Sequence, residues 1–163
     1  MRAPRLLVYG GESLGSQSAE AAFDDVADLR SSVDGALFVG PPNSNILWRS
    51  LVDGRDPGSP PEVLPTYDDG LAVRFAEDAQ NLEPDGRPWL EPRVLYLQHA
   101  SDPVVWWGPD LLFTRPDWLS EPPGTDRVPS MRWYPIVTFW QVAGGMSCAA
   151  RHRRSGTGTT TRI

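Results

Sequence analysis

The sequence predicts an α/β domain in which helices cover a parallel β-sheet. Three apolar segments have the length and composition of buried strands, at residues 6–9, 36–39 and 93–98. Helical patterns follow the first two, and this alternation of strand and helix is typical of parallel sheets. The chain has 163 residues, of which 40% are hydrophobic and 22% are charged, as expected for one globular domain.

The first strand leads into the stretch with the strongest functional signal. Gly11-Glu12-Ser13-Leu14-Gly15 follows residues 6–9, and residues 13–30 are expected to form one helix because apolar side chains recur at helical spacing. A serine flanked by glycines, with a strand before it and a helix after it, is the context of a nucleophile elbow. We therefore predict that Ser13 is a nucleophile and that the backbone N–H of Leu14 helps to bind an oxyanion.

The two glycines of this motif have a predicted steric role. A side chain at Gly11 or Gly15 is expected to collide with the neighbouring strand or helix, because the serine sits on a sharp turn. The alternative for the whole motif is a Gly-Ser loop that merely ends a strand, since so short a pattern also occurs by chance.

The middle of the chain contains more loop than regular structure. A short helix over residues 46–51 is expected after the second strand, with a polar residue at 43–45 as its cap. Residues 53–92 are rich in Pro, Gly and Asp and contain one modest strand at 71–75. We expect this region to be a surface excursion rather than part of the core.

The C-terminal part divides into an ambiguous segment and a polar tail. Residues 135–142 fit a helix or a strand equally well. From Arg151 onward there are almost no apolar side chains, so we expect disorder there. We place the domain at residues 1–142 and a disordered or aberrant tail at residues 143–163.

A serine nucleophile needs a base, and the base needs an acid to orient it. In one large fold these groups come in the chain order serine, acid, histidine. Asp102 follows the third strand and has the right order. Because the carboxyl ends of parallel strands share one edge of a sheet, Asp102 and Ser13 are expected to meet there. The structural alternative for Asp102 is a turn or a helix cap, which is common for Asp-Pro.

The base is the weakest part of this prediction, because the chain has two histidines and neither is well placed. His99 precedes Asp102 and breaks the expected order, so we interpret it as structural or pocket-lining. His152 has the right order but lies in the polar, Arg-rich tail, where little would hold it within hydrogen-bond reach of a serine. His152 is therefore only a weak candidate for the base.

Charge and composition exclude several classes of function. The net charge of −6 and a pI of about 4.8 argue against nucleic acid as a partner. There is no apolar run of about 18 residues, as a transmembrane helix would need. Two scattered histidines and one cysteine give no metal-ligand spacing. The glycines fit neither a dinucleotide fingerprint nor a phosphate-binding loop, so no cofactor is expected.

Tryptophan is abundant, with 7 residues of this type in the chain. Most lie in the second half, at positions 106, 107, 118, 133 and 140. We interpret them first as core and loop packing. The alternative is an apolar wall around an acyl or lipid-like substrate.

Long strings of residues resemble an actinobacterial family of α/β-hydrolase catalytic domains, which form the C-terminal part of multi-pass membrane proteins of poorly defined role. The resemblance covers about residues 4–142 and rests on Tyr9 with residues 11–16, 20–25, 34–37, 40–45, 97–99, 101–107, 131–133 and 137–142. It implies an α/β-hydrolase fold, with helices on both faces of a parallel sheet, and it implies Ser13 as nucleophile and Asp102 as acid.

The chain also departs from the family pattern. Family members carry more catalytic domain upstream, preceded by membrane helices, so the N-terminal strands and the loop with the second oxyanion donor are expected to be missing here. Gly10-Gly11 is one glycine longer than the usual Tyr-Gly-Glu-Ser. The family closes with a Gly- and His-rich segment that provides the base, where this chain has residues 155–161, Ser-Gly-Thr-Gly-Thr-Thr-Thr.

This tail suggests a frame-shifted gene. Threonine codons begin with A-C, so a triplet read one base earlier ends in A-C and encodes His, Tyr, Asn or Asp. Gly-Thr-Gly-Thr-Thr-Thr is thus compatible with Gly-His-Gly-His-Asn-Tyr in the adjacent frame. We predict that the chain is the product of a truncated and frame-shifted gene, and resequencing codons 143–163 tests this. The idea fails if no frame gives an ending that contains histidine.

Residues and resemblance together predict a serine hydrolase that acts on the ester, thioester or amide carbonyl of a small-molecule or lipid-like acyl substrate, with impaired activity in this chain. Esterase, lipase-like and acyl-transfer reactions use the same residues. The alternative is a non-catalytic remnant that acts as a binding or interaction fragment. The chain is expected to be soluble as written, whereas full-length relatives are membrane-associated, and its own compartment is not predicted.

Overall fold

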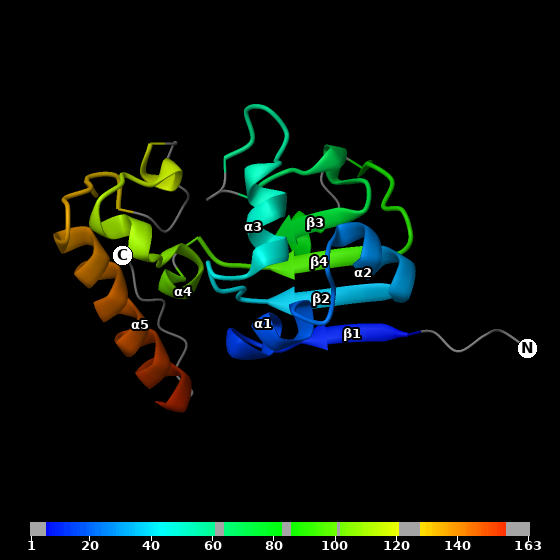
Figure 1. Cartoon of the computed structure of the whole chain (residues 1–163), viewed down its shortest axis with the longest axis horizontal. Helices are drawn as coiled ribbons and strands as arrows, with labels where there is room; N and C mark the ends of the chain where they lie inside the picture. Colours follow the sequence, from blue (N-terminus) through cyan, green and yellow to red (C-terminus); the bar gives the residue numbers. More distant parts are fainter. Residues whose placement is uncertain (1–5, 61–63, 83–85, 101, 121–127, 156–163) are drawn as a thin grey trace, which may run out of the picture.

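The computed structural model describes residues 6–60, 64–82, 86–100, 102–120 and 128–155, with the backbone alone at residues 81 and 147–155. Its centre is a four-stranded sheet in which every neighbouring pair is parallel (Figure 1). The strands are β1 (Leu7–Gly10), β2 (Gly35–Val39), β3 (Val73–Ala76) and β4 (Arg93–Leu97), in the spatial order β1-β2-β4-β3. The predicted α/β class with a parallel sheet is confirmed.

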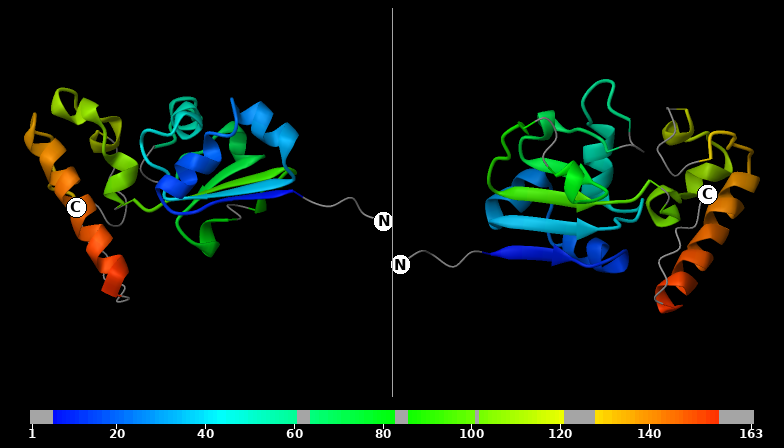
Figure 2. Two further views of the ribbon diagram at one scale, coloured as in Figure 1. Left: turned by 60° about the horizontal axis from the view of Figure 1, so that its bottom comes forward. Right: turned by 180° about the vertical axis from the view of Figure 1, so that it is seen from behind.

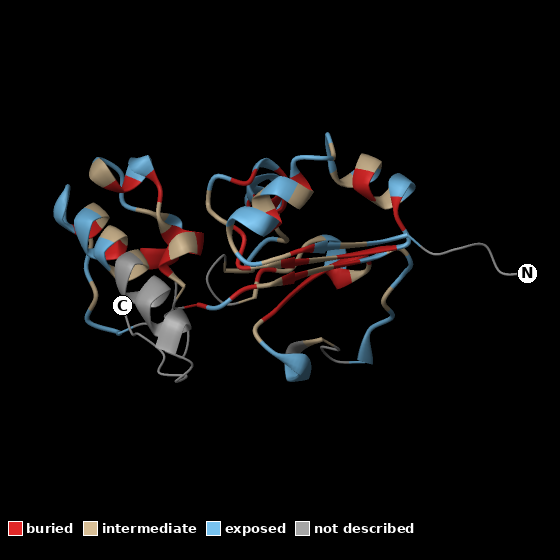
Figure 3. Ribbon diagram, turned by 90° about the horizontal axis from the view of Figure 1, so that it is seen from below, coloured by how far each residue is buried: buried red, intermediate tan, exposed pale blue. Residues whose placement is uncertain are grey.

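Three helices cover one face of this sheet. They are α1 (Leu14–Glu20), α2 (Val26–Ser32) and α3 (Ile46–Asp53), and all three lie above the strands in the edge-on view of Figure 3. Helices were expected on both faces, whereas these three share one. The views in Figure 2 agree with this arrangement.

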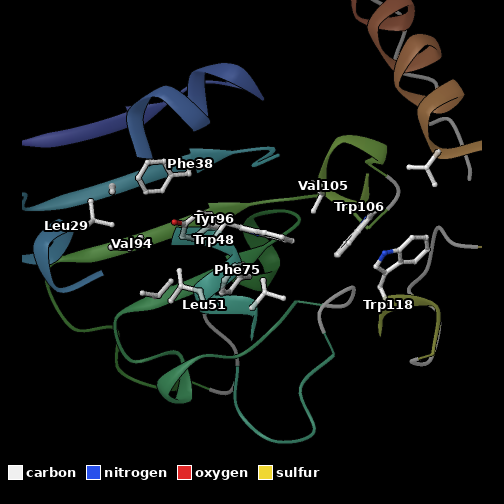
Figure 4. Packing of buried hydrophobic residues seen from close by; sticks show 14 of the residues in the cluster. Leu29, Phe38, Trp48, Leu51, Phe75, Val94, Tyr96, Val105, Trp106 and Trp118 are labelled. Carbon is white, nitrogen blue, oxygen red and sulfur yellow. The ribbon is translucent and has the colours of Figure 1, made fainter. Parts of the chain in front are cut away.

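The core lies between the sheet and these helices. Phe38 and Phe75 stack against Tyr96, with ring centroids 5.1 and 5.3 Å apart, because the three side chains come from adjacent strands in register (Figure 4). Leu29 of α2 and Leu51 of α3 are almost completely buried over the same face. Burial of such large apolar side chains is the main stabilising contribution to the fold.

The single helix expected over residues 13–30 is in fact two helices. α1 ends at Glu20 and α2 begins at Val26. Asp25 is the N-cap of α2, and its side chain accepts a hydrogen bond of 2.7 Å from the backbone N–H of Asp28. Aspartate favours such a cap over a helix interior, so one helix ends before Asp25 and another begins after it.

The Pro- and Gly-rich region contains β3, the strand predicted at residues 71–75, and because this strand is buried the expected surface excursion was wrong for this part. All four residues of β3 are buried, and the strand pairs with β4. The Arg74 side chain in β3 is held by the loops on either side, because it donates hydrogen bonds to the carbonyls of Gly70, Leu82, Arg87 and Pro88.

The C-terminal part forms a group of helices beyond the carboxyl ends of the strands (Figure 1). It contains α4 (Pro103–Trp106), two short 3₁₀ segments (Pro109–Leu112 and Asp117–Leu119) and α5 (Val137–Ser155). The ambiguous segment at residues 135–142 therefore begins a helix. The predicted boundary at residue 142 falls inside α5, whose backbone is helical through residue 155, and residues 156–163 lie outside the description.

Contacts between tryptophan rings join these helices to the sheet domain. Trp106 lies edge-on to Trp48 of α3 and also contacts Trp118, and all three are at least 94% buried. Packing is thus their main role, as first interpreted. In the part of the chain described by the structure, no helix is both long and apolar enough to cross a membrane.

Candidate active site

Ser13 has a backbone conformation that L-amino acids rarely adopt. Its φ and ψ are 56° and −109°, whereas Asp69, which also has a positive φ, lies in the ordinary left-handed region at 54° and 19°. The Ser13 values match the first central position of a type II′ turn, which glycine normally occupies. Such strain costs on the order of 1–3 kcal/mol, and it is most often found at functional sites.

Contacts on both sides hold this strained turn in place. The backbone N–H of Ser13 donates to the carbonyl of Val39, at 3.2 Å, and the carbonyl of Ser13 accepts from the N–H of Gln17, at 3.0 Å. The first bond ties the elbow to the end of β2, and the second begins α1. Ser13 is the N-cap residue of α1, yet its side chain makes no cap hydrogen bond. Its hydroxyl therefore does not have the usual capping role of a serine at this position.

A glycine just before the motif allows α1 to pack closely against β2. A Cβ atom on Gly10 would lie 2.8 Å from Cδ1 of Phe38 and 3.0 Å from Cα of Ser16, so a side chain does not fit there. The expected steric role of the motif's own glycines was wrong. A Cβ on Gly15 would meet nothing within 4 Å, and one on Gly11 would approach only the Tyr9 ring, at 3.9 Å.

Asp102 lies on the loop after β4, and that loop is firmly held. Oδ1 of Asp102 accepts from the N–H of Val104 at 3.0 Å and so caps α4, which is the structural role weighed for an Asp-Pro sequence. The indole N–H of Trp106 donates to the carbonyl of Ala100 at 2.8 Å, and the N–H of Ala100 donates to Glu77 at 3.1 Å. These bonds fix the Asp102 carboxylate at the edge of the sheet.

Gly40 lies between the predicted nucleophile and the predicted acid. It follows β2, which separates β1 from β4, and its φ is +53°. A Cβ atom there would lie 3.4 Å from Oδ2 of Asp102 and 3.8 Å from the backbone nitrogen of Ser13. The structure thus brings the Asp102 carboxylate and the backbone of Ser13 close to one glycine at the carboxyl edge of the sheet.

The polar groups at this edge are those that acyl transfer uses. Ser13 supplies a hydroxyl and Asp102 a carboxylate, and the backbone N–H of Leu14 lies in the first turn of α1, where helix amides lack intrahelical partners. Within the described residues, no group of three His, Cys, Asp or Glu side chains could hold a metal ion.

A comparison with protein-family models matches residues 1–160 to an alpha/beta-hydrolase family. The chain belongs to this family. The match continues past residue 142, where the resemblance noted in the sequence ends. Comparison with curated proteins gave no match, and neither did comparison with solved structures.

The two histidines of this chain lie in different parts of the structure. His99 is exposed on the loop after β4, and its carbonyl accepts from the N–H of Asp102 at 3.0 Å. His152 lies in the C-terminal turns of α5, and its side chain is outside the described residues. His99 is thus the one histidine whose side chain the structure describes, and its loop is shared with the acid.

Trp48, Trp106 and Trp118 line a cavity of about 250 Å³ together with arginine and aspartate side chains, and neither Ser13 nor Asp102 lines it. Trp140, which is 66% exposed, lies on α5.

Sequence reasoning missed a buried polar pair on the inner face of α1. Glu20 is 2% exposed, and one of its carboxylate oxygens accepts a hydrogen bond of 2.5 Å from the hydroxyl of Tyr96, which is fully buried. Burial raises the pKa of the Glu20 carboxyl above its ordinary value, although its hydrogen-bond donors partly offset this. Burial and the nearby Glu20 charge also raise the pKa of Tyr96. The available signal in the sequence was the spacing of Ser16 and Glu20, because residues four apart share one face of a helix.

Proposed function

We propose that the chain is a serine hydrolase in which Ser13 attacks the carbonyl carbon of an ester, a thioester or an amide. The observation that carries this proposal is the strained backbone of Ser13, at the junction of β1 and α1, with a hydroxyl that does not cap the helix. A strained serine at a strand-to-helix turn exposes its hydroxyl above the sheet. Membership of the alpha/beta-hydrolase family supports the same chemistry.

The proposed reaction has two stages. Ser13 Oγ bonds to the carbonyl carbon and gives its proton to a base, while the N–H of Leu14 binds the oxyanion. The tetrahedral intermediate then expels the alcohol, thiol or amine, which takes up the proton. Water hydrolyses the acyl-serine, or an alcohol accepts the acyl group. Asp102 orients the base, for which His152 is the weak candidate, and we expect the activity to be impaired.

Hydrolysis of activated acyl esters tests this proposal. The purified chain is incubated with p-nitrophenyl esters of short and long fatty acids, and release of nitrophenol is measured. We expect saturable hydrolysis, at a rate roughly 10³–10⁴-fold above that of water, as for triads that lack one member. The acyl-length series separates a small-molecule preference from a lipid-like one.

Two serine variants provide the controls for this experiment. Ser13→Ala is expected to form no acyl-enzyme, which mass spectrometry detects in wild type, while binding and the oxyanion donor leave part of the rate. Ser31→Ala removes an exposed hydroxyl on α2 and should leave the rate unchanged. If the folded wild-type chain releases nitrophenol no faster than buffer does, the hydrolase proposal fails and the non-catalytic alternative is favoured.

A further inference from the structure

The helix that follows Ser13 packs against the core through polar side chains. Ser16 and Glu20 are the buried residues of α1, with exposed fractions of 0% and 2%. A helix normally turns an apolar stripe toward the core. The two residues are four apart and so lie on one face, directly below the elbow. Burying polar side chains costs free energy of folding, so the polar face of α1 needs a physical explanation.

Glu20 connects three elements at this point. Its carboxylate accepts a hydrogen bond from the Tyr96 hydroxyl of β4, and it also interacts with the backbone N–H of Trp48 in the first turn of α3. Asn45 is the N-cap residue of α3, but its side chain makes no cap hydrogen bond. Glu20 therefore reaches from α1 to the N-terminus of α3, where negative charge is favoured.

Stability alone does not explain a carboxylate in this place. Glu20 is the last residue of α1, where a negative charge is unfavourable for that helix's own dipole. Removing a carboxylate from water has a further cost, and apolar residues of similar volume often serve a buried site as well or better. Glu20 fixes the position of α1 relative to β4 and α3, because its side chain makes directional interactions with both of them.

The elements that Glu20 joins are those that carry the proposed catalytic groups. α1 begins at Leu14, directly after Ser13. β4 contains Tyr96 and runs into Gln98, whose amide oxygen accepts from the Trp48 indole at 2.8 Å, and then into the loop with Asp102. Movement of α1 relative to β4 would thus displace the hydroxyl from the acid.

We propose that Glu20 is a positioning residue that fixes the elbow relative to Asp102 by joining α1 to Tyr96 and to the N-terminus of α3. This inference rests on the proposed function for its catalytic meaning. A positional error of about 1 Å far from the reacting atoms can lower a rate by roughly a hundredfold, so such a residue influences catalysis without touching the substrate.

Hydrogen–deuterium exchange of the whole chain tests the positioning role without requiring activity. Glu20→Gln and Tyr96→Phe are compared with wild type, and Asp53→Asn serves as the matched control because it removes an exposed carboxylate from α3. We expect amides at residues 11–18 to exchange roughly tenfold to a hundredfold faster in the first two variants, since bonds to a charged group are lost. The Asp53 variant should match wild type.

Global stability separates positioning from ordinary stabilisation. In urea at neutral pH, we expect Glu20→Gln to unfold at a midpoint no lower than that of wild type, while its elbow exchanges faster. A lower midpoint with faster exchange throughout the sheet would mean that Glu20 only stabilises the fold, and unchanged exchange at residues 11–18 would mean that it does not hold the elbow. Either result overturns the inference.

The ester assay tests whether Glu20 also influences the rate of catalysis. We expect Glu20→Gln to lower kcat at least tenfold and to leave KM nearly unchanged, because the substrate still binds while the nucleophile is misplaced. If wild type hydrolyses the esters and Glu20→Gln does so equally fast, the inference is overturned and the proposed function stands. If wild type is inactive, the proposed function fails, and the exchange data alone decide whether Glu20 holds the elbow.

Discussion

Ser13→Gly is expected to unfold at a higher urea concentration than wild type and to form no acyl-enzyme with ester substrates. Glycine adopts the φ of 56° and ψ of −109° without a steric penalty, so the variant recovers strain on the order of 1–3 kcal/mol. About 0.5–1 kcal/mol of this is lost again, because glycine is more flexible in the unfolded chain. The expected net gain lies between about 0 and 2.5 kcal/mol, centred at about 1 kcal/mol, and is measured as the free energy of unfolding.

Two further variants show whether strain is the cause. Ser13→Ala keeps a Cβ atom, and with it the strain, so it should be less stable than Ser13→Gly. Ser31→Gly places glycine in α2, where it is expected to destabilise the chain by up to roughly 0.5 kcal/mol. Equal stability of Ser13→Ala and Ser13→Gly would show that the elbow stores no strain and would remove the main support for a catalytic serine.

Arg74→Ala is expected to destabilise the chain by about 3 kcal/mol or more, because a large buried side chain is lost and four backbone carbonyls lose a charged donor. Arg74 is 3% exposed and donates to carbonyls of residues 70, 82, 87 and 88, and its guanidinium lies 4.8 Å from the centre of the Trp89 ring. Its loss would release the loops that flank β3. Urea unfolding followed by tryptophan fluorescence measures the effect.

Arg87→Ala is the matched control, because its side chain is 49% exposed where it pairs with Asp69. Exposed ion pairs contribute at most about 1 kcal/mol, so this variant should stay close to wild type. Similar losses for the two arginine variants would contradict a core role for β3 and would return residues 53–92 to a surface role.

Local pattern was sufficient to predict the regular parallel sheet. Residues 6–9, 36–39 and 93–98 are apolar runs of strand length, and all three are strands in the structure. Local sequence pattern was insufficient where contacts between distant segments decide whether a strand is buried. β3 overlaps the strand predicted at residues 71–75, but its burial was not predicted, because it contains an arginine whose burial depends on the surrounding carbonyls.

The candidate site was predicted in part, for a similar reason. The spacing of Ser13 and Asp102 relative to their strands placed both at one edge, because parallel strands end together. Gly40 and Glu20 were missed, since their roles depend on contacts between segments far apart in the chain: Gly40 lies against Asp102, and Glu20 bonds to Tyr96. No local motif records such contacts.

Covalent labelling of Ser13 tests the central claim most directly. The purified chain is treated with a fluorophosphonate, which reacts with activated serine hydroxyls, and the modified peptide is identified by mass spectrometry. We predict one adduct, on Ser13, which is absent in Ser13→Ala and unchanged in Ser31→Ala. A correctly folded wild-type chain that takes up no fluorophosphonate, or takes it up only at another serine, would contradict the assignment of Ser13 as a nucleophile.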